Sequence, residues 1–385
     1  MIIAFDAKRA AQNRTGLGNY SRFVLDILSQ HTPDNKFLLY APNPKKASCL
    51  GAYKDNEKFE IRYPKSVLGK MFRSLWRTFG ITSCVQKSGA QIFHGLSNEL
   101  PLNIRKAKSV KSIVTVHDLI FLHCPQYYSA IDRFLYNYKY RRSCLNADHI
   151  IAVSEYTKRE IMQLYDIPSE KITVVYQGCD KAFAQREPES KLREVRKTYS
   201  LPHLYILYVG SIEERKNLML LAKALKLMPD HIRVVAVGKR TSYAAEVEKY
   251  LRSEGLEERM QMIHGVPFDH LPAIYQMATV FCYPSRIEGF GIPLLEALNS
   301  GVPVVACTGS CLEEAGGPDS VYVAPDDDRA LAKNLIRIWD DRSLQQQMVE
   351  AGYRYAHNFA DEKLAADLMQ VYEKVLKNSE LTMNN

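Results

Sequence analysis

Residues 279–308 have the sequence TVFCYPSRIEGFGIPLLEALNSGVPVVACT, and this stretch decides the fold. Two short apolar runs, 279–285 and 303–308, stand on either side of a helical pattern that begins near Pro293. Strands joined by a helix lie parallel, and strands this apolar are buried on both faces. The stretch therefore predicts one unit of a parallel sheet that is covered by helices.

The same alternation runs through both halves of the chain, whose 385 residues are too many for one ordinary core. It predicts an α/β fold with two domains, 1–178 and 179–358, each a doubly wound parallel sheet. The polar segment 179–202 is interpreted as a linker that leads into a short helix. The strands expected in the first domain are 2–7, 36–41, 91–94, 112–116, 149–154 and 172–178. Those expected in the second domain are 205–210, 232–238, 260–265, 279–285, 303–308 and 321–325.

Composition bounds the class of protein. Hydrophobic residues make up 46% of the chain and charged residues 24%, as in soluble globular proteins. The first residues, MIIAFDAKRA, lack the pattern of a signal peptide, and no apolar run is long enough to span a bilayer. The eight cysteines include no C-x-x-C pair. We therefore expect a cytoplasmic protein with reduced thiols and no zinc site.

Charge is distributed unevenly between the two halves. Residues 1–178 hold 26 Lys and Arg against 14 Asp and Glu, a net charge of +12, and the remainder has a net charge of −4. This asymmetry predicts that the first half meets an anionic ligand or surface. Nucleic acid is not the expected partner, because no helix-turn-helix, zinc-finger or RNP-type pattern is present.

Candidate binding residues of the first half follow predicted strands. Ligands bind beyond the carboxyl ends of parallel strands, so two such domains facing each other are expected to form a deep cleft. Gly16 and Gly18 open a helix after the first strand and could let amides approach a phosphate, although a plain strand-to-helix turn explains them equally. His117 follows the strand 112–116, where its ring could bind a ligand. Alternatively it is a structural histidine held by Asp118 or by the backbone.

A pair of cations opens the helix of the second half. Arg215 and Lys216 precede a helix N-terminus, where the helix dipole disfavours positive charge. A bound anion would remove this conflict, and a planar guanidinium beside a point charge suits a diphosphate. The alternative is an exposed basic turn.

Two carboxylates flank the helix start in the opening stretch. Glu288 and Glu296 have seven residues between them, and Gly289 and Gly291 allow a tight backbone that exposes its amides. Amides at a helix start can bind phosphate or sugar oxygens, while carboxylates accept hydrogen bonds from sugar hydroxyls. The alternative is that both glutamates are charges favoured by the helix dipole.

Together these motifs resemble those of a known family. The segments YVGSIEERKN (208–217), VFCYPSRIEGFGIPLLEALNSGVPVVA (280–306) and CLEEAGGPDSVYVAPDD (311–327) resemble the donor-binding domain of family 4 glycosyltransferases, which have the GT-B architecture of two Rossmann-like domains. The first half is similar to the mannosyltransferase-like branch of that family. The segments that carry this similarity are GLGNYSR (16–22), FHGLSNELP (93–101), TVHDLIFLHCPQYY (115–128) and IIAVSEYTKREIMQLYDIP (150–168).

The resemblance implies a role for each candidate residue. Arg215 and Lys216 would hold the donor pyrophosphate, and Glu296 would accept hydrogen bonds from the ribose. His117 would lie beside the transferred sugar on the opposite wall of the cleft. That sugar would be held by Glu288 and the backbone of Gly289, Phe290 and Gly291. Gly16 and Gly18 would line the cleft near the phosphate and the acceptor.

The implied activity is retaining, metal-independent transfer of a hexose, mannose from GDP-mannose, to a glycan or lipid-linked acceptor in polysaccharide biosynthesis. No cofactor is expected, because the nucleotide sugar is a substrate. A sugar-nucleotide epimerase of the same architecture and a non-catalytic sugar-nucleotide binder are the alternatives. The C-terminal helix, 359–385, is expected to pack back on the first domain.

Two departures from the family pattern affect the expected site. Ser310-Cys311-Leu312-Glu313 stands where a serine followed by Pro-Glu is usual, so this loop is expected to run differently. Asn19 stands where an arginine is common, which leaves the acceptor open.

Residues 65–80 predict a basic amphipathic helix. Leu68, Phe72, Leu75, Trp76 and Phe79 fall on one face, and Lys65, Lys70, Arg73 and Arg77 gather mostly on another. This pattern is typical of a helix lying on an anionic membrane, which would place the protein on the cytoplasmic face. It is also found in helices whose apolar face lies in a domain core.

Overall fold

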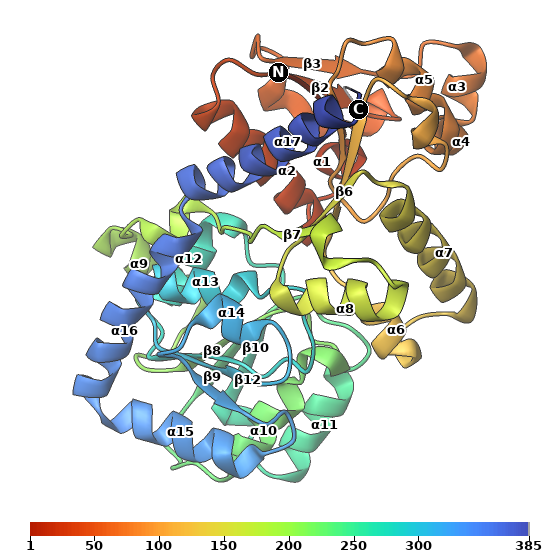
Figure 1. Ribbon diagram of the computed structural model, residues 1–385. Helices are drawn as coiled ribbons and strands as arrows, with labels where there is room; N and C mark the ends of the chain where they lie inside the picture. The colour runs from red at the N-terminus through yellow and green to blue at the C-terminus, as the bar shows by residue number, and fades with distance from the viewer. Residues whose placement is uncertain (384–385) are drawn as a thin grey trace. The chain divides into compact units, whose positions relative to one another are not determined.

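The computed structural model describes residues 1–383, with side chains as far as residue 378. The chain forms two compact units (Figure 1): the first is residues 1–177 with the C-terminal segment from residue 361, and the second is residues 178–360. Each unit contains one wholly parallel sheet with helices packed on it. The predicted α/β class with two doubly wound parallel sheets is therefore confirmed.

The sheet of the first unit has the order β3-β2-β1-β4-β5-β6-β7 within the described residues. Its strands are β1 (Ile2–Asp6), β2 (Lys36–Tyr40), β3 (Phe59–Arg62), β4 (Ile92–Gly95), β5 (Lys111–Val116), β6 (His149–Ala152) and β7 (Ile172–Val174). β3 is not among the predicted strands; it is an edge strand that alternates apolar and charged residues. Only Phe59 among its four residues is buried, and β3 lacks the continuous apolar run of the other strands.

The sheet of the second unit has the order β10-β9-β8-β11-β12-β13 in the described chain. Its strands are β8 (Ile206–Val209), β9 (Val234–Val237), β10 (Met260–Ile263), β11 (Val280–Tyr283), β12 (Val304–Cys307) and β13 (Val321–Val323). All six lie in strands that the sequence predicts. Because β9 lies on one side of β8 and β11 on the other, the strand order reverses between β8 and β11. Between β1 and β4 the first sheet reverses in the same way.

Helices of the first unit follow the strands along the chain. They are α1 (Lys8–Gln12), α2 (Gly16–His31), α3 (Val67–Met71), α4 (Arg73–Leu75), α5 (Ile81–Gln86), α6 (Ile120–His123), α7 (Ala130–Asn146), α8 (Glu155–Tyr165) and α17 (Asp361–Met383). The terminal helix α17 packs against α2, and its Tyr372 hydroxyl lies 2.8 Å from His94 Nδ1 on β4. His94 also contacts Thr115, so it is a buried structural histidine. Residues 384 and 385 of the predicted terminal helix lie outside the described residues.

Helices of the second unit surround its sheet. They are α9 (Glu189–Tyr199), α10 (Leu218–Lys226), α11 (Ala244–Ser253), α12 (Leu271–Gln276), α13 (Ile292–Asn299), α14 (Leu312–Gly316), α15 (Asp328–Asp340) and α16 (Arg342–Ala356). Leu218, Leu221 and Leu225 of α10 are completely buried in the core of this unit. The short helix predicted in the segment 179–202 is α9.

The segment 65–80 differs from the single helix that its periodicity predicts. It consists of α3, α4 and a π-helical turn, Trp76–Gly80, with a break at Phe72. Of its predicted apolar face only Trp76 is buried, whereas Leu68, Phe72, Leu75 and Phe79 are exposed. The alternative that this apolar face lies in a domain core is therefore wrong, because four of its five side chains are exposed.

Candidate functional site

The predicted donor residues lie at the carboxyl edge of the second sheet. Arg215 and Lys216 end a short 3₁₀ turn, Glu214–Lys216, that follows β8, and Glu288 follows β11. These two strands flank the point where the strand order reverses, which is where open α/β sheets bind ligands. Residues 72 positions apart are thereby brought into contact.

Glu288 is bound by both cations at once. Its Oε2 lies 3.0 Å from Arg215 Nη1, and its Oε1 lies 2.6 Å from Lys216 Nζ. The hydroxyls of Ser285 and Tyr283 donate to the same Oε1 at 2.6 and 3.0 Å. Thus the conflict between two cations and a helix N-terminus is relieved here by a carboxylate of the protein itself.

The ion pairs fix the charge of this cluster. Burial alone would raise the pKa of Glu288, but the charges of Lys216 and Arg215 outweigh it and lower the pKa to about 2. Arg215 is held further by donation to the Ile287 carbonyl at 2.7 Å and by Glu213 at 2.9 Å. Glu288 is therefore ionised at neutral pH, and both cations are fixed in place.

The loop after Glu288 leads into the start of α13 through Gly291. Gly291 has φ +127°, and a Cβ atom there would lie 3.0 Å from Leu312 and 3.1 Å from Ala315. Any side chain would therefore be strained at this position. Buried Cys311 places its sulfur 3.1 Å from the Glu288 carbonyl and 2.9 Å from the Phe290 carbonyl. The loop at residues 310–313, which departs from the family pattern, thus contacts the loop at residues 288–291 through the thiol of Cys311.

Glu296 lies in the middle of α13 and differs from Glu288 in its surroundings. It is half-buried, and the Tyr275 hydroxyl donates to its Oε2 at 2.8 Å. Burial raises the pKa of Glu296 to about 7, and the charge of Asp180 acts in the same direction, against the Tyr275 hydrogen bond. With this pKa, Glu296 changes its charge near neutral pH, and its oxygens accept hydrogen bonds, as the contact with Tyr275 shows.

The candidates of the first unit lie at the edge of its own sheet. His117 is buried, its Nε2 lies 2.9 Å from the Leu96 carbonyl, and its ring packs edge-on against Tyr20. The backbone contact considered in the structural alternative is therefore present, and Nε2 is the donor because a carbonyl can only accept. Burial lowers the pKa of His117 to about 4, so the ring is neutral at pH 7.

Gly16 and Gly18 differ in what surrounds them. A Cβ atom at Gly16 would meet nothing within 4 Å, whereas one at Gly18 would lie 1.9 Å from the Asn13 carbonyl oxygen. Gly18 is therefore required by the packing of α2, while Gly16 faces open space. The predicted approach of these glycines and of His117 to the donor stays a prediction.

Four side chains that hold the predicted donor residues are not among the candidates that the sequence motifs indicate. Tyr283 and Ser285 lie in the quoted stretch but carry no charge, and Tyr275 and Cys311 come from other segments. Tyr283 and Ser285 could have been found from their position at the carboxyl end of a predicted strand. The contact between Tyr275 and Glu296 joins residues 21 positions apart and has no signal in the sequence.

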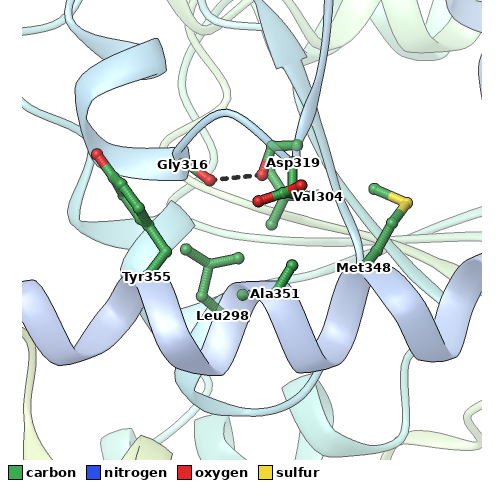
Figure 2. Close-up of a pocket in the computed structure, with 9 residues that line it drawn as sticks. Leu298, Val304, Gly316, Asp319, Met348, Ala351 and Tyr355 are labelled. Atoms are coloured by element: carbon green, nitrogen blue, oxygen red, sulfur yellow. Dashed lines mark hydrogen bonds between the residues drawn. The ribbon is translucent and has the colours of Figure 1, made fainter.

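A small pocket lies elsewhere in the second unit (Figure 2). It is lined by Leu298 near the end of α13, by Met348, Ala351 and Tyr355 of α16, and by residues around Gly316. The Ser320 hydroxyl donates to the Gly316 carbonyl at 2.6 Å beside it. Its lining includes none of the predicted donor residues, so we do not assign the donor to it.

Comparison with known protein families agrees with both units. The family model described as "Glycosyltransferase Family 4" matches residues 33–183, and "Glycosyl transferases group 1" matches residues 194–355. The O-antigen chain mannosyltransferase B of Escherichia coli is 30% identical over 288 residues, covering 73% of this chain and 74% of that protein. The O-antigen chain mannosyltransferase RfbU of Salmonella typhimurium is 29% identical over 231 residues, covering 59% and 61%.

Solved structures share the fold across nearly the whole chain. A glycosyltransferase from Rickettsia africae has a TM-score of 0.76 at 17% identity and covers 98% of both chains. The HepE protein of Anabaena, in complex with UDP and glucose, has a TM-score of 0.74 at 17% identity and covers 97% of this chain and 99% of its own. The matching models, the E. coli relative and the GT-B fold together show that this chain is a glycosyltransferase of family 4, similar to its mannosyltransferases.

Proposed function

We propose that the protein transfers mannose from GDP-mannose to a glycan or lipid-linked acceptor in polysaccharide biosynthesis, with retention of configuration and without a metal ion. The cluster of Arg215, Lys216 and Glu288 carries this proposal. It places two fixed cations at the strand-order reversal of the second sheet, beside the start of α13.

The two cations suit a diphosphate leaving group. The guanidinium can bind two oxygens in its plane, and the ammonium binds as a point charge. Negative charge grows on the diphosphate as the bond to the sugar breaks, so fixed positive groups stabilise the transition state more than the ground state. In this proposal they do the work that a divalent metal does in other phosphate-transfer sites, and no metal is required.

The polar groups around the cations suit the sugar and the ribose. Glu288 and the loop Gly289–Gly291 would bind hydroxyls of the transferred sugar, and Glu296 would accept from the ribose. For retention, the acceptor hydroxyl attacks from the face that the diphosphate leaves, and a diphosphate oxygen takes its proton. The names of the relatives in Escherichia coli and Salmonella typhimurium support mannose as the sugar.

A thermal-shift panel tests the donor. GDP-mannose, UDP-glucose, ADP-glucose and dTDP-glucose are each added to the full chain in the presence of EDTA. We expect the largest rise in melting temperature with GDP-mannose, because ligands that bind only the folded state stabilise it. A larger rise with another nucleotide sugar would refute GDP-mannose as the donor. A rise with GDP-mannose that appears only when a divalent metal replaces EDTA would refute the metal independence.

A turnover assay tests the reaction itself. The protein is incubated with GDP-mannose and a mannose-terminated oligosaccharide, and the product is followed by proton NMR. An α-mannosyl product supports retaining transfer, and a β-mannosyl product refutes it. Formation of an epimeric nucleotide sugar without acceptor would refute transfer as the activity.

The positive charge of the first half supports a peripheral contact with an anionic membrane on its cytoplasmic face. None of the helices in the described residues combines the length and the apolar character needed to cross a bilayer. A lipid-linked acceptor could therefore be reached from a protein lying on the membrane surface, with residues 65–80 as the contact.

A further inference from the structure

Helix α7 of the first unit presents an apolar stripe on its exposed face. Ile131, Phe134, Leu135 and Tyr138 follow the spacing i, i+3, i+4, i+7, so they lie on one side of the helix. Ile131 is 73% exposed and Phe134 72%, and the other two are also exposed. In a helix of a globular core this stripe would be the buried one. An exposed stripe of this size indicates a surface that binds something.

A second set of exposed apolar side chains lies in α3, α4 and the π-helical turn. Leu68 is 68% exposed, and Val67, Met71, Phe72, Leu75 and Phe79 are exposed as well. The local structure explains this: Gly69 and Trp76 are the buried residues of these elements, so the segment is attached by one side only.

The two sets are attached to the same short loop after β4. Glu99 accepts from Arg77 of the π-helical turn at 2.6 Å and lies 4.0 Å from Lys139 of α7. The Leu100 amide donates to Ser143 of α7, and the Leu102 amide donates to the carbonyl of Thr78, on the π-helical turn. Figure 1 places α3, α4 and α7 on the same side of the first unit. We call the two sets together the paired apolar surface.

The charges around the paired apolar surface are almost all positive. Residues 65–80 include four basic residues and no acidic one, and α7 contains four basic residues and only Asp132 as an acid. Lys65, Lys70, Arg141 and Arg142 are exposed. Apolar side chains that enter the acyl boundary, with cations at the level of the phosphates, fit an anionic bilayer.

We propose that the paired apolar surface inserts into the interface of an anionic lipid bilayer, with α7 as well as residues 65–80 in contact with lipid. This inference rests on the proposed function, which includes a membrane contact by residues 65–80. It extends that contact to α7, which the sequence pattern does not indicate. Arg77 is excluded from the lipid contact, since its charge is bound inside the unit by Asp6 and Glu99.

Vesicle sedimentation of the full chain tests the surface. Vesicles of phosphatidylcholine, with and without roughly one third phosphatidylglycerol, are used at low salt. Three double variants are compared: Ile131→Ser/Phe134→Ser, Leu68→Ser/Leu75→Ser, and the control Leu204→Ser/Leu227→Ser, whose residues are exposed in the second unit. We expect each of the first two to lower binding to anionic vesicles at least tenfold and the control to bind as the wild type does.

Insertion has its own readout. In Phe134→Trp, the new indole should shift its emission to shorter wavelength with anionic vesicles and be quenched by brominated lipid. The two native tryptophans, Trp76 and Trp339, are buried and should not respond. Binding that survives the Ile131→Ser/Phe134→Ser change would overturn the role of α7. A different result would be that the variants of the paired apolar surface abolish a concentration-dependent dimer of the wild type and leave vesicle binding unchanged. That result would make the surface an interface between two copies and overturn the lipid assignment.

The outcomes separate this inference from the proposed function. The melting-temperature shift with GDP-mannose and transfer to a water-soluble oligosaccharide need no membrane, so both should be unchanged in all three double variants. If the wild type transfers mannose but binds no vesicles, the paired apolar surface is wrong and the proposed function stands. If vesicle binding behaves as expected but no nucleotide sugar is bound, the paired apolar surface stands and the proposed function is wrong.

Discussion

Both sheets place an arginine among carboxylates where their strand order reverses, yet the two clusters have opposite charge. In the first unit Arg77 lies between Asp6 at 2.7 Å and Glu99 at 2.6 Å, so one cation serves two carboxylates. In the second unit one carboxylate, Glu288, serves two cations, of which Arg215 is one. All these side chains are less than one fifth exposed.

This difference separates a structural cluster from a binding cluster. Burial alone would lower the pKa of Arg77, but the two carboxylates outweigh it and raise the pKa, so its charge is fully used inside the protein. In the second unit the cations Arg215 and Lys216 exceed the buried negative charge, because Glu213, the further partner of Arg215, is 42% exposed and well screened. Of these two clusters, the one at the second sheet is therefore the one that keeps positive charge for a ligand.

Replacing Arg77 should have the largest effect on stability. Arg77→Met leaves buried Asp6 without its cation and leaves Glu99 with only the partly exposed Lys139, 4.0 Å away. We expect the free energy of unfolding to fall by about 3–5 kcal/mol. Arg73→Met, in the same segment, is the matched control and should change it by less than about 0.5 kcal/mol. Chemical denaturation measures both. An equal loss of unfolding free energy in the two variants would show that any change in this segment destabilises the protein and that the ion pairs of Arg77 are not the cause.

A rescue variant sharpens the same test. Adding Asp6→Asn and Glu99→Gln to Arg77→Met removes the unpaired charges, so most of the lost stability should return. If the triple variant is no more stable than Arg77→Met, buried charge is not the cause of the loss.

Removing Glu288 should affect turnover more than binding. We expect Glu288→Ala to slow mannosyl transfer by about a hundredfold or more, because a group aimed at the transferred sugar is lost. Binding of GDP should survive, since both cations remain. Glu213→Ala removes the exposed partner of Arg215 and serves as the control, with little change in rate. Initial rates and calorimetric titration with GDP measure the two effects, and unchanged turnover in Glu288→Ala would refute its role.

Glu296 should make stability fall as pH rises. Its pKa is about 7 in the folded protein against an ordinary value of 4.5, so the folded state holds the proton more tightly than the unfolded state. Stability from this group is fully present below pH 4.5 and is lost as pH rises through 7, by up to about 3 kcal/mol. Glu296→Gln cannot ionise, so it should be more stable than the wild type at pH 8 and equal to it at pH 4.

The donor should respond to the same ionisation. If the carboxylate of Glu296 accepts from the ribose, KM for the donor falls in the wild type as pH rises through about 7. Glu296→Gln should lose this pH dependence and bind the donor more weakly. The surface variant Glu246→Gln on α11 controls for a change in net charge. A wild-type KM that is flat across this range would contradict the assigned role.

The contrast between the clusters also explains what the sequence could and could not predict. Arg215, Lys216 and Glu288 lie in turns directly after predicted strands, so their meeting follows from the parallel sheet alone. Helical periodicity places Arg77 with the outward basic residues, but the segment breaks at Phe72, so the periodicity does not hold across it. Its partners are 71 and 22 positions away, and no local pattern reports contacts at that distance.

The glycines of α2 give the smallest expected effects and test whether the first sheet edge binds ligand at all. Gly18→Ala forces a Cβ atom to 1.9 Å from a backbone oxygen, so the backbone must shift, at a cost of about 1–3 kcal/mol. Gly16→Ala meets no atom within 4 Å and should leave the free energy of unfolding unchanged within about 0.5 kcal/mol. A drop in transfer rate for Gly16→Ala at unchanged stability must then come from contact with a substrate, because the protein offers nothing for the methyl group to strike. An unchanged rate would remove Gly16 from the site and leave α2 with a purely structural glycine at position 18.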